Sequence, residues 1–347
     1  MRRLGLWLVL GTVLATGCTA SVPRERITFA VLAGVYYSVR PEARVEAAMV
    51  RQSDALLRKA VTDLNAARDL DFVIVAGDLL AGADSLSLDR AGAILAELRI
   101  PYYVVLGEYD GPGLPVTAAA EAPGSPETRA ELLPTSVSRS TIVWAFQGRG
   151  FTGSEGYWSR EVLPGLLLVG LDTVVPGQRG GHVDARQLAW LDRTLASRAD
   201  KATILIAHHG IVPLHPLDEG VAWQSVMVDN AGAVRDVLAR HKNVLMVVTA
   251  HHHLAQGQVT GPIVYLASPS VSVWPLAYHL VRLTPKEVEA VWIPLADDAL
   301  TQQAQDRLLA SPTYRSVFPA GEDGDTACIR LFGGNKMSIH PLPAIRP

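Results

Sequence analysis

The chain has 347 residues, of which 49% are apolar and 19% are charged. These values allow a sizeable hydrophobic core and exclude a chain that is disordered throughout. The formal net charge is −3 and no basic stripe stands out, so the electrostatics give no support for nucleic-acid binding.

The N-terminus resembles a bacterial lipoprotein signal. Arg2 and Arg3 precede an apolar run of about a dozen residues, and small residues then lead into Cys18. Such a run matches a secretory signal and is too short to span a bilayer. We therefore expect residues 1–17 to be a signal peptide and Cys18 to carry a lipid such as palmitate. The alternative is an ordinary cleaved signal with an incidental cysteine.

A lipid on Cys18 would place the protein in the cell envelope of a bacterium, anchored to a membrane. Thr19 follows the cysteine, where an aspartate is associated with retention in the inner membrane. This favours the outer membrane or the cell surface. Since Cys328 is the other cysteine in the sequence, lipidation of Cys18 would also leave no disulfide within the chain.

Apolar runs typical of buried strands alternate with helical patterns along the chain. The strand-like runs are residues 27–34, 71–78, 102–110, 166–173, 202–210 and 243–253, and the helical patterns are 44–69, 86–99, 184–198 and 230–241. This alternation predicts parallel strands with right-handed crossovers. The last runs, 262–270, 277–284 and 288–295, follow one another without helices, so we expect them to be antiparallel.

Residues that can bind metals come at the ends of four strand-like runs. They are Asp78, Glu108 with Asp110, His208 with His209, and the triplet His251, His252 and His253. In open α/β sheets the ligand crevice lies at the carboxyl ends of the strands. Mixed imidazole and carboxylate donors favour Zn, Mn or Fe over Ca. The alternative is a polar edge of the sheet that binds no metal.

The histidine triplet has a simple geometric interpretation. If the extended backbone continues past the strand, side chains alternate in direction. His251 and His253 would then face the metal site, and His252 would face away.

These residues resemble the sequence blocks of the calcineurin-like metallophosphoesterase superfamily, nearest in layout to its cyclic-nucleotide phosphodiesterase-like branch. The blocks read D-x-H, G-D, G-N-H-D or G-N-H-E, a lone H, and G-H-x-H. Here Gly77 and Asp78 match the second block, His208 the fourth, and His251 and His253 the fifth.

The resemblance implies an α/β fold, a four-layer α/β/β/α sandwich with mixed sheets. We expect the chain to divide into a signal peptide (1–17), a tether (18–26), the phosphoesterase domain (27–296) and a C-terminal extension (297–347).

The first and third blocks depart from the family pattern. Gly34 stands where the first-block aspartate belongs, and Tyr36 stands where its histidine belongs. In the third block Glu108 replaces the asparagine and Tyr109 replaces the histidine, while Asp110 remains. Tyr109 and Asp110 are the candidate catalytic residues, although a phenol of pKa ~10 is a poorer acid at neutral pH than an imidazole.

The resemblance implies two metals that share the second-block aspartate. One site retains only Asp78 and His253, and the other retains Asp78, Glu108, His208 and His251. We therefore expect one divalent ion, Mn, Fe or Zn, rather than two, with Asp78, Glu108, His208, His251 and His253 as the candidate ligands.

Two functions follow from these residues. The first is a metal-dependent phosphoesterase-like hydrolase, anchored in the envelope, that acts on monoesters or diesters of phosphorylated small molecules or lipids. The second is a catalytically inactive homologue that binds a ligand or a metal. A lipid-anchored scaffold without any ligand would explain the fold but not the surviving metal-binding residues.

Overall fold

The computed structural model describes residues 25–40, 43, 45–112, 137–215, 218, 227–315 and 336–339. The predicted signal peptide and Cys18 lie outside these residues. Within the described part of the chain, no helix combines the length and the apolar character needed to cross a membrane.

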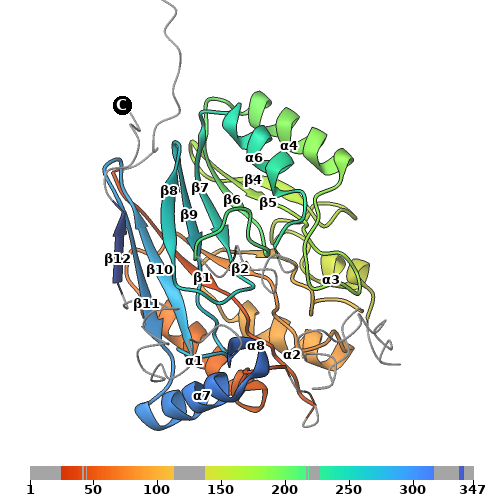
Figure 1. Ribbon diagram of the computed structural model, residues 1–347, viewed down its shortest axis with the longest axis vertical. Coiled ribbons are helices and arrows are strands. Elements are labelled where there is room, and N and C mark those ends of the chain that lie inside the picture. The colour runs from red at the N-terminus through yellow and green to blue at the C-terminus, as the bar shows by residue number, and fades with distance from the viewer. Residues whose placement is uncertain are drawn as a thin grey trace, which may run out of the picture.

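The strands among the described residues form two six-stranded sheets that face each other (Figure 1). The first sheet has the order β12-β11-β10-β1-β2-β3. Its strands are β1 (Ile27–Leu32), β2 (Phe72–Ala76), β3 (Tyr102–Val105), β10 (Ala277–Leu283), β11 (Val288–Pro294) and β12 (Lys336–Ile339). The strands β1, β2 and β3 are parallel, whereas β10, β11 and β12 add to them antiparallel.

The second sheet has the order β4-β5-β6-β7-β9-β8. Its strands are β4 (Trp158–Leu163), β5 (Leu166–Gly170), β6 (Ala202–Ile206), β7 (Val244–Thr249), β8 (Gly257–Thr260) and β9 (Ile263–Ala267). The four inner strands are parallel, and the edge strands β4 and β8 are antiparallel to their neighbours. Both sheets are therefore mixed, as expected.

The helices lie around the two sheets. They are the short 3-10 helix Val50–Gln52, α1 (Ser53–Ala66), α2 (Ser85–Ala96), α3 (Arg139–Ala145), α4 (Ala185–Ser197), α6 (Ala231–Ala239), α7 (Asp298–Ala310) and α8 (Pro312–Arg315). Three of the longer helices begin at an aspartate that accepts a hydrogen bond from a backbone N–H three residues on, which stabilises the first turn. These caps are Asp84, Asp184 and Asp297.

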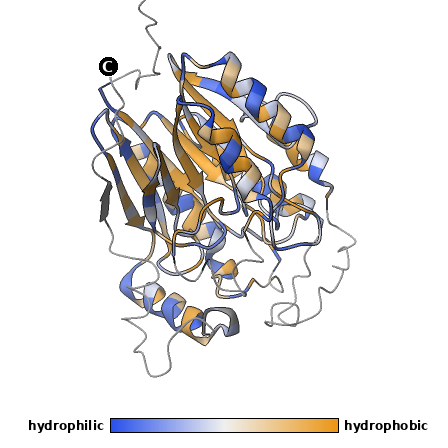
Figure 2. Cartoon of the chain, turned by 45° about the horizontal axis from the view of Figure 1, so that its top comes forward, coloured by the Kyte–Doolittle hydropathy of each residue, from blue (hydrophilic) through white to orange (hydrophobic). Residues whose placement is uncertain are grey.

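Alternation along the second sheet divides its side chains between two cores. Leu166 and Leu168 face inward and pack in one cluster with the first sheet and with α1 and α2. Leu167 and Val169 face outward and pack against α4 and α6, the helices that cover this sheet in Figure 1. A period of two along each strand produces this division. Figure 2 shows the strands predominantly apolar and α4 and α6 with both apolar and polar residues. The four-layer α/β/β/α expectation is confirmed.

The pairing of β9 differs from the sequence expectation. The run that contains Ile263–Ala267 was expected to be antiparallel, but β9 pairs parallel with β7 and antiparallel only with β8. The chain leaves β7, forms β8 at the sheet edge and returns to insert β9 between them. A strand thus replaces the helix as the crossover, and a missing helix did not imply antiparallel pairing. The antiparallel expectation for β10 and β11 is confirmed.

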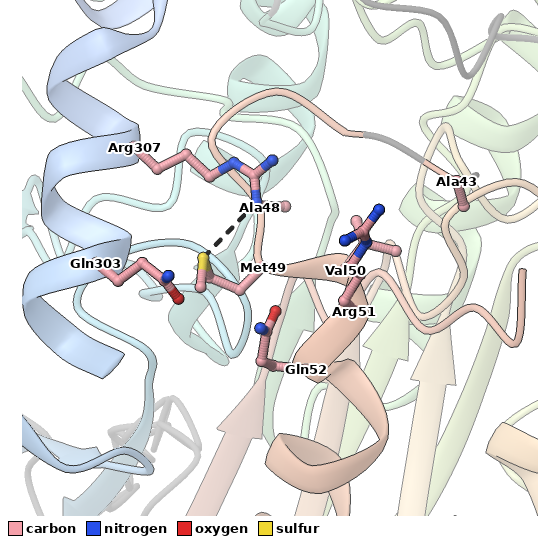
Figure 3. A pocket seen from close by; sticks show the side chains of 8 residues that line it. All are labelled: Ala43, Ala48, Met49, Val50, Arg51, Gln52, Gln303 and Arg307. Atoms are coloured by element: carbon pink, nitrogen blue, oxygen red, sulfur yellow. Dashed lines mark hydrogen bonds between the residues drawn. The ribbon is translucent and has the colours of Figure 1, made fainter. Parts of the chain in front are cut away.

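The helix α7 belongs to the segment that was expected to be a C-terminal extension, and it lies against the body of the protein. Ala304 is buried in the main core. Arg307 contacts the sulfur of Met49 at 3.8 Å, next to a surface pocket that α7 shares with the segment around Met49 (Figure 3).

Candidate metal centre

Four of the predicted ligands lie together where the carboxyl ends of the two sheets meet. Asp78 and Glu108 follow β2 and β3 of the first sheet, whereas His208 and His251 follow β6 and β7 of the second. His208 Nε2 lies 2.7 Å from Glu108 Oε2 and 3.3 Å from Asp78 Oδ2. His251 Nδ1 lies 3.0 Å from Glu108 Oε1 and 3.3 Å from His208 Nε2. Four of the candidate ligands that the strand-end reasoning singled out therefore lie together, and their role as ligands stays a prediction.

The backbone at these positions is not extended. Asp78, His251 and His253 have φ angles of 53°, 58° and 58°, in the left-handed region that non-glycine residues seldom adopt. Each such residue costs about 1–3 kcal/mol, and backbone strain of this kind clusters at functional sites. The turns begin directly after the strands and direct the side chains across the gap between the two sheets.

The extended geometry expected for the histidine triplet was therefore wrong, since β7 ends at Thr249. The side chains nevertheless diverge. His251 faces Glu108, His252 pairs with buried Asp218 at 3.0 Å, and His253 Nε2 lies 3.1 Å from the hydroxyl of Tyr36. Two left-handed residues produce the separation that alternation along a strand was expected to give.

Backbone hydrogen bonds hold the donor atoms in position. His208 Nδ1 lies 2.8 Å from the carbonyl oxygen of Ala76. Because a carbonyl only accepts, Nδ1 carries a proton and is occupied by the backbone. Nε2 is therefore the ring nitrogen that faces Asp78 and Glu108, and it could bind a cation once its own proton is lost. Asp78 Oδ1 accepts from the backbone N–H of Tyr109 at 3.0 Å, which ties the second block to the third.

The carboxylate of Asp110 accepts hydrogen bonds from backbone amides. Its Oδ1 accepts from Leu80 N and its Oδ2 from Gly107 N, both at 2.9 Å. Burial and the neighbouring charge of Asp78 raise the pKa of Asp110 to about 7. The hydrogen bonds show that Asp110 fastens the loop that carries Glu108. Its role as a catalytic residue stays a prediction.

The electrostatics of the cluster favour an anionic Glu108 beside a cationic partner. Burial would raise the pKa of Glu108, but the imidazoles of His251 and His208 hold that pKa well below its usual range. Burial would lower the pKa of His208, but Asp78 and Glu108 hold it well above its usual range. Burial lowers the pKa of His251 and brings that of His253 to about 3. The carboxylates thus hold a positive charge at His208, and a bound cation would take over that role.

The donor set fits a divalent cation. Metal–nitrogen and metal–oxygen bonds of about 2.0–2.2 Å place two donors of one ion no more than about 4.4 Å apart. The separations given above satisfy this limit, namely those from His208 to Asp78, Glu108 and His251 and the one from His251 to Glu108. Two carboxylates and two imidazoles form the mixed oxygen and nitrogen set that Mn, Fe and Zn accept.

His209 also lies at the cluster, and sequence reasoning did not assign it a role. A ring nitrogen of His209 falls within 4.8 Å of ligand atoms from Glu108, His208 and His251. However, its Nε2 lies 3.1 Å from the carbonyl oxygen of Arg179 and its Nδ1 2.7 Å from Thr173 Oγ1. The carbonyl requires a proton on Nε2, so His209 presents no lone pair there. In this arrangement it is a neighbour of the donor set.

His253, Tyr36 and Tyr109 form a second set of side chains beside Asp78. The hydroxyl of Tyr36 donates to Asp78 Oδ2 at 2.9 Å, and its ring meets the ring of Tyr109 edge to face, with centroids 5.2 Å apart. His253 therefore reaches the carboxylate of Asp78 through a phenol. On the far side of the imidazole, His253 Nδ1 lies 3.2 Å from the hydroxyl of Tyr314 on α8. No sequence motif predicts this contact.

The comparisons with known proteins agree with this geometry. Residues 50–255 match the family described as calcineurin-like phosphoesterase. The chain belongs to the calcineurin-like phosphoesterase family. The match begins after Gly34 and Tyr36, the positions at which the first block departs from the family pattern.

Proteins similar to the chain include phosphodiesterases of cyclic nucleotides. The chain is 26% identical over 239 residues to the 3',5'-cyclic adenosine monophosphate phosphodiesterase CpdA of Escherichia coli K12. The aligned region covers 68% of this chain and 74% of the relative. It is 25% identical over 228 residues to a probable cyclic nucleotide phosphodiesterase of Synechococcus, and the aligned region covers 63% of this chain and 75% of the relative.

Solved structures share the fold. A dimetal phosphatase from Danio rerio superimposes with a TM-score of 0.58 at 17% identity, covering 78% of this chain and 97% of the phosphatase. A purple acid phosphatase from yellow lupin gives a TM-score of 0.51 at 12% identity, covering 78% and 52%. At these identities the likeness concerns the fold alone.

Proposed function

We propose that the protein is a metal-dependent phosphoesterase in which Asp78, Glu108, His208 and His251 hold one divalent cation, Mn, Fe or Zn. The observation that carries this proposal is the convergence of these four buried side chains from two sheets. Buried carboxylates and imidazoles at this density need either one another or a cation. The relatives named above support phosphodiesters, cyclic nucleotides among them, as the first substrates to test, followed by phosphomonoesters and phosphorylated lipids.

The residues around the proposed cation site have different roles. When bound, the cation would act as a Lewis acid toward a phosphoryl oxygen and lower the pKa of water. Glu108 and Asp78 supply negative charge that retains the cation, and the bond to Ala76 fixes the imidazole of His208. The candidate catalytic residues are Tyr109 and Asp110, both of them buried beside the site.

The proposed location is the bacterial cell envelope, with a lipid on Cys18 anchoring the protein to a membrane, preferentially the outer membrane or the cell surface. The support for this location is the order of charged, apolar and small residues before the cysteine.

A specific observation favours a second function, that of an inactive homologue that binds a ligand or a metal in the envelope. Tyr36 stands where the family pattern has a histidine, and its phenol bonds to Asp78 and His253. Drift in a centre that no longer turns over would produce such a replacement.

Hydrolysis of bis(p-nitrophenyl) phosphate by purified mature protein, with added Mn²⁺, decides between the two functions. We expect turnover that falls by about 10² or more in Asp78→Asn, because this variant loses the charge that helps to retain the cation. His182→Ala is a matched control, since His182 lies at the surface and pairs with Asp229. If the wild-type protein turns over no faster than Asp78→Asn with any of Mn²⁺, Fe²⁺ and Zn²⁺, the result would favour the inactive homologue.

A further inference from the structure

A continuous series of hydrogen bonds joins the C-terminal helix α8 to Asp78. Tyr314 Oη lies 3.2 Å from His253 Nδ1, His253 Nε2 lies 3.1 Å from Tyr36 Oη, and Tyr36 Oη lies 2.9 Å from Asp78 Oδ2. All four side chains are buried, so no solvent competes for these bonds.

The donors along this series point in one direction. The hydroxyl of Tyr36 donates its single proton to Asp78, so the oxygen of Tyr36 must accept a hydrogen bond from His253 Nε2–H. His253 then has a lone pair on Nδ1, which accepts from the hydroxyl of Tyr314. One neutral tautomer of His253 satisfies every bond.

The phenol of Tyr36 lies between Asp78 and His253, the two residues that the family resemblance assigns to a second cation. Its ring is held edge to face against Tyr109 and against His253, with centroids 5.2 and 5.7 Å apart. A second cation bound to Asp78 and His253 would have to displace this ring.

Gly34 supports the same conclusion. An added Cβ at Gly34 would lie 2.6 Å from Ser270 Oγ and 2.9 Å from His253 Nε2. Ser270 Oγ is not free to move away, because it donates to the carbonyl oxygen of Gly34 and accepts from the N–H groups of Ser272 and Val273. An aspartate therefore does not fit at position 34 while His253 keeps its bond to Tyr36.

The helices α7 and α8 hold Tyr314 in place. Leu308 of α7 and Tyr314 of α8 are buried in one cluster with Tyr36 and Tyr109. The C-terminal segment thus contributes a wall of the centre as well as the first donor of the series.

We infer that Tyr36, His253 and Tyr314 form a directed hydrogen-bond chain that fills the position of a second cation, so that α7 and α8 complete a centre for one cation. This inference rests on the proposed function only for the first cation. The hydrogen-bond chain itself exists with or without metal. Tyr314 is a positioning residue, since it acts on Asp78 through His253 and Tyr36.

Equilibrium dialysis against excess Mn²⁺, followed by elemental analysis, tests the stoichiometry. We expect saturation at one Mn²⁺ per chain. Two equivalents in the wild-type protein would overturn the inference, because the phenol would then not exclude a second ion. Absence of any bound Mn²⁺ would contradict the proposed function, and the next measurement would decide the hydrogen-bond chain separately.

A double-mutant cycle in EDTA tests the hydrogen-bond chain without metal. Tyr36→Phe and Tyr314→Phe remove hydroxyls that do not touch but share His253, so the urea midpoint of the double variant should shift by less than the sum of the single shifts. Tyr37→Phe is the matched control, because its buried ring carries a hydroxyl that donates to Asp54 at 2.9 Å. It should combine additively with Tyr314→Phe. Additivity in both pairs would overturn the inference.

The tautomer of His253 gives a reading that does not depend on any variant folding. In the ¹⁵N spectrum of the metal-free wild-type protein, His253 should carry its proton on Nε2. Tyr36→Phe should shift the ring toward the Nδ1–H tautomer, because Nε2–H loses its acceptor while Nδ1–H can donate to the hydroxyl of Tyr314. Tyr37→Phe should leave the tautomer unchanged. A wild-type ring protonated on Nδ1, or on both nitrogens, would contradict the directed chain.

Discussion

Gly34 and Tyr36 show how two residues can change a metal centre together. Tyr36 has a φ of 48° and Gly34 a φ of 53°, so both lie in the left-handed region, which glycine adopts easily and tyrosine does not. The backbone turn brings the Tyr36 hydroxyl to Asp78, and the absence of a Cβ on Gly34 leaves room for Ser270 and His253. Neither replacement is a simple loss of a ligand, because each supports the packing of the other.

Substitution of Gly34 provides a test at this scale. Gly34→Ala should lower the free energy of unfolding by about 1–3 kcal/mol, through an unfavourable φ and contacts below 3 Å. Gly92 lies half-buried in α2, where an added Cβ meets no atom within 4 Å. Gly92→Ala should therefore raise the free energy of unfolding by about 0.5–1 kcal/mol. Urea unfolding measures both. A harmless Gly34→Ala would show that the loop has room for a first-block side chain.

At the scale of elements, the strands end earlier than their apolar runs. The runs 71–78 and 243–253 were read as strands that include the metal-binding residues, but β2 ends at Ala76 and β7 at Thr249. The turns that follow are what aim the side chains. The helix α7 likewise has a packing role, because Ala304 and Leu308, one turn apart, face the core and the aromatic cluster of the centre.

Truncation of Leu308 measures the contribution of α7. Leu308 is fully buried, so Leu308→Ala should lower the free energy of unfolding by about 2–5 kcal/mol through lost burial and a residual cavity. Gln303 of the same helix is exposed and lines the surface pocket (Figure 3). Gln303→Ala should change the free energy of unfolding by about 0.5 kcal/mol or less. Equal effects of the two substitutions in urea unfolding would show that α7 does not dock as described.

At the scale of the whole molecule, the two sheets divide the centre between them. Asp78 and Glu108 come from the first sheet and His208 and His251 from the second, so the donors meet only when the sandwich is assembled. The predicted anchor is also a property of the whole protein. A lipid on Cys18 would precede the first described strand by a short tether and keep the centre near a membrane.

Lipid labelling tests the anchor. Cells that express the full chain should incorporate radioactive palmitate into the protein and retain it in the membrane fraction. Cys18→Ser should abolish both, because the acylated side chain is lost. Cys328→Ser is the control with the second cysteine changed, and it should behave as wild type. A membrane-bound, labelled Cys18→Ser protein would refute the lipoprotein signal.

The sequence by itself determined the class of fold and the identities of the candidate donors. Strand and helix periods are local properties, and a carboxylate or an imidazole just after a buried strand is visible in the sequence. These signals predicted the four-layer sandwich, through the family resemblance, and placed Asp78, Glu108, His208 and His251 at one edge.

The tertiary structure alone decided the insertion of β9 beside β7, the left-handed turns and the partners of His253. Tyr36 and His253 are 217 residues apart in sequence, and His253 and Tyr314 are 61 apart. Local patterns specify which side of an element is buried, whereas the choice of a distant hydrogen-bond partner depends on how complete layers pack. This is why the sequence could show that first-block ligands were replaced, but not that a phenol fills their place.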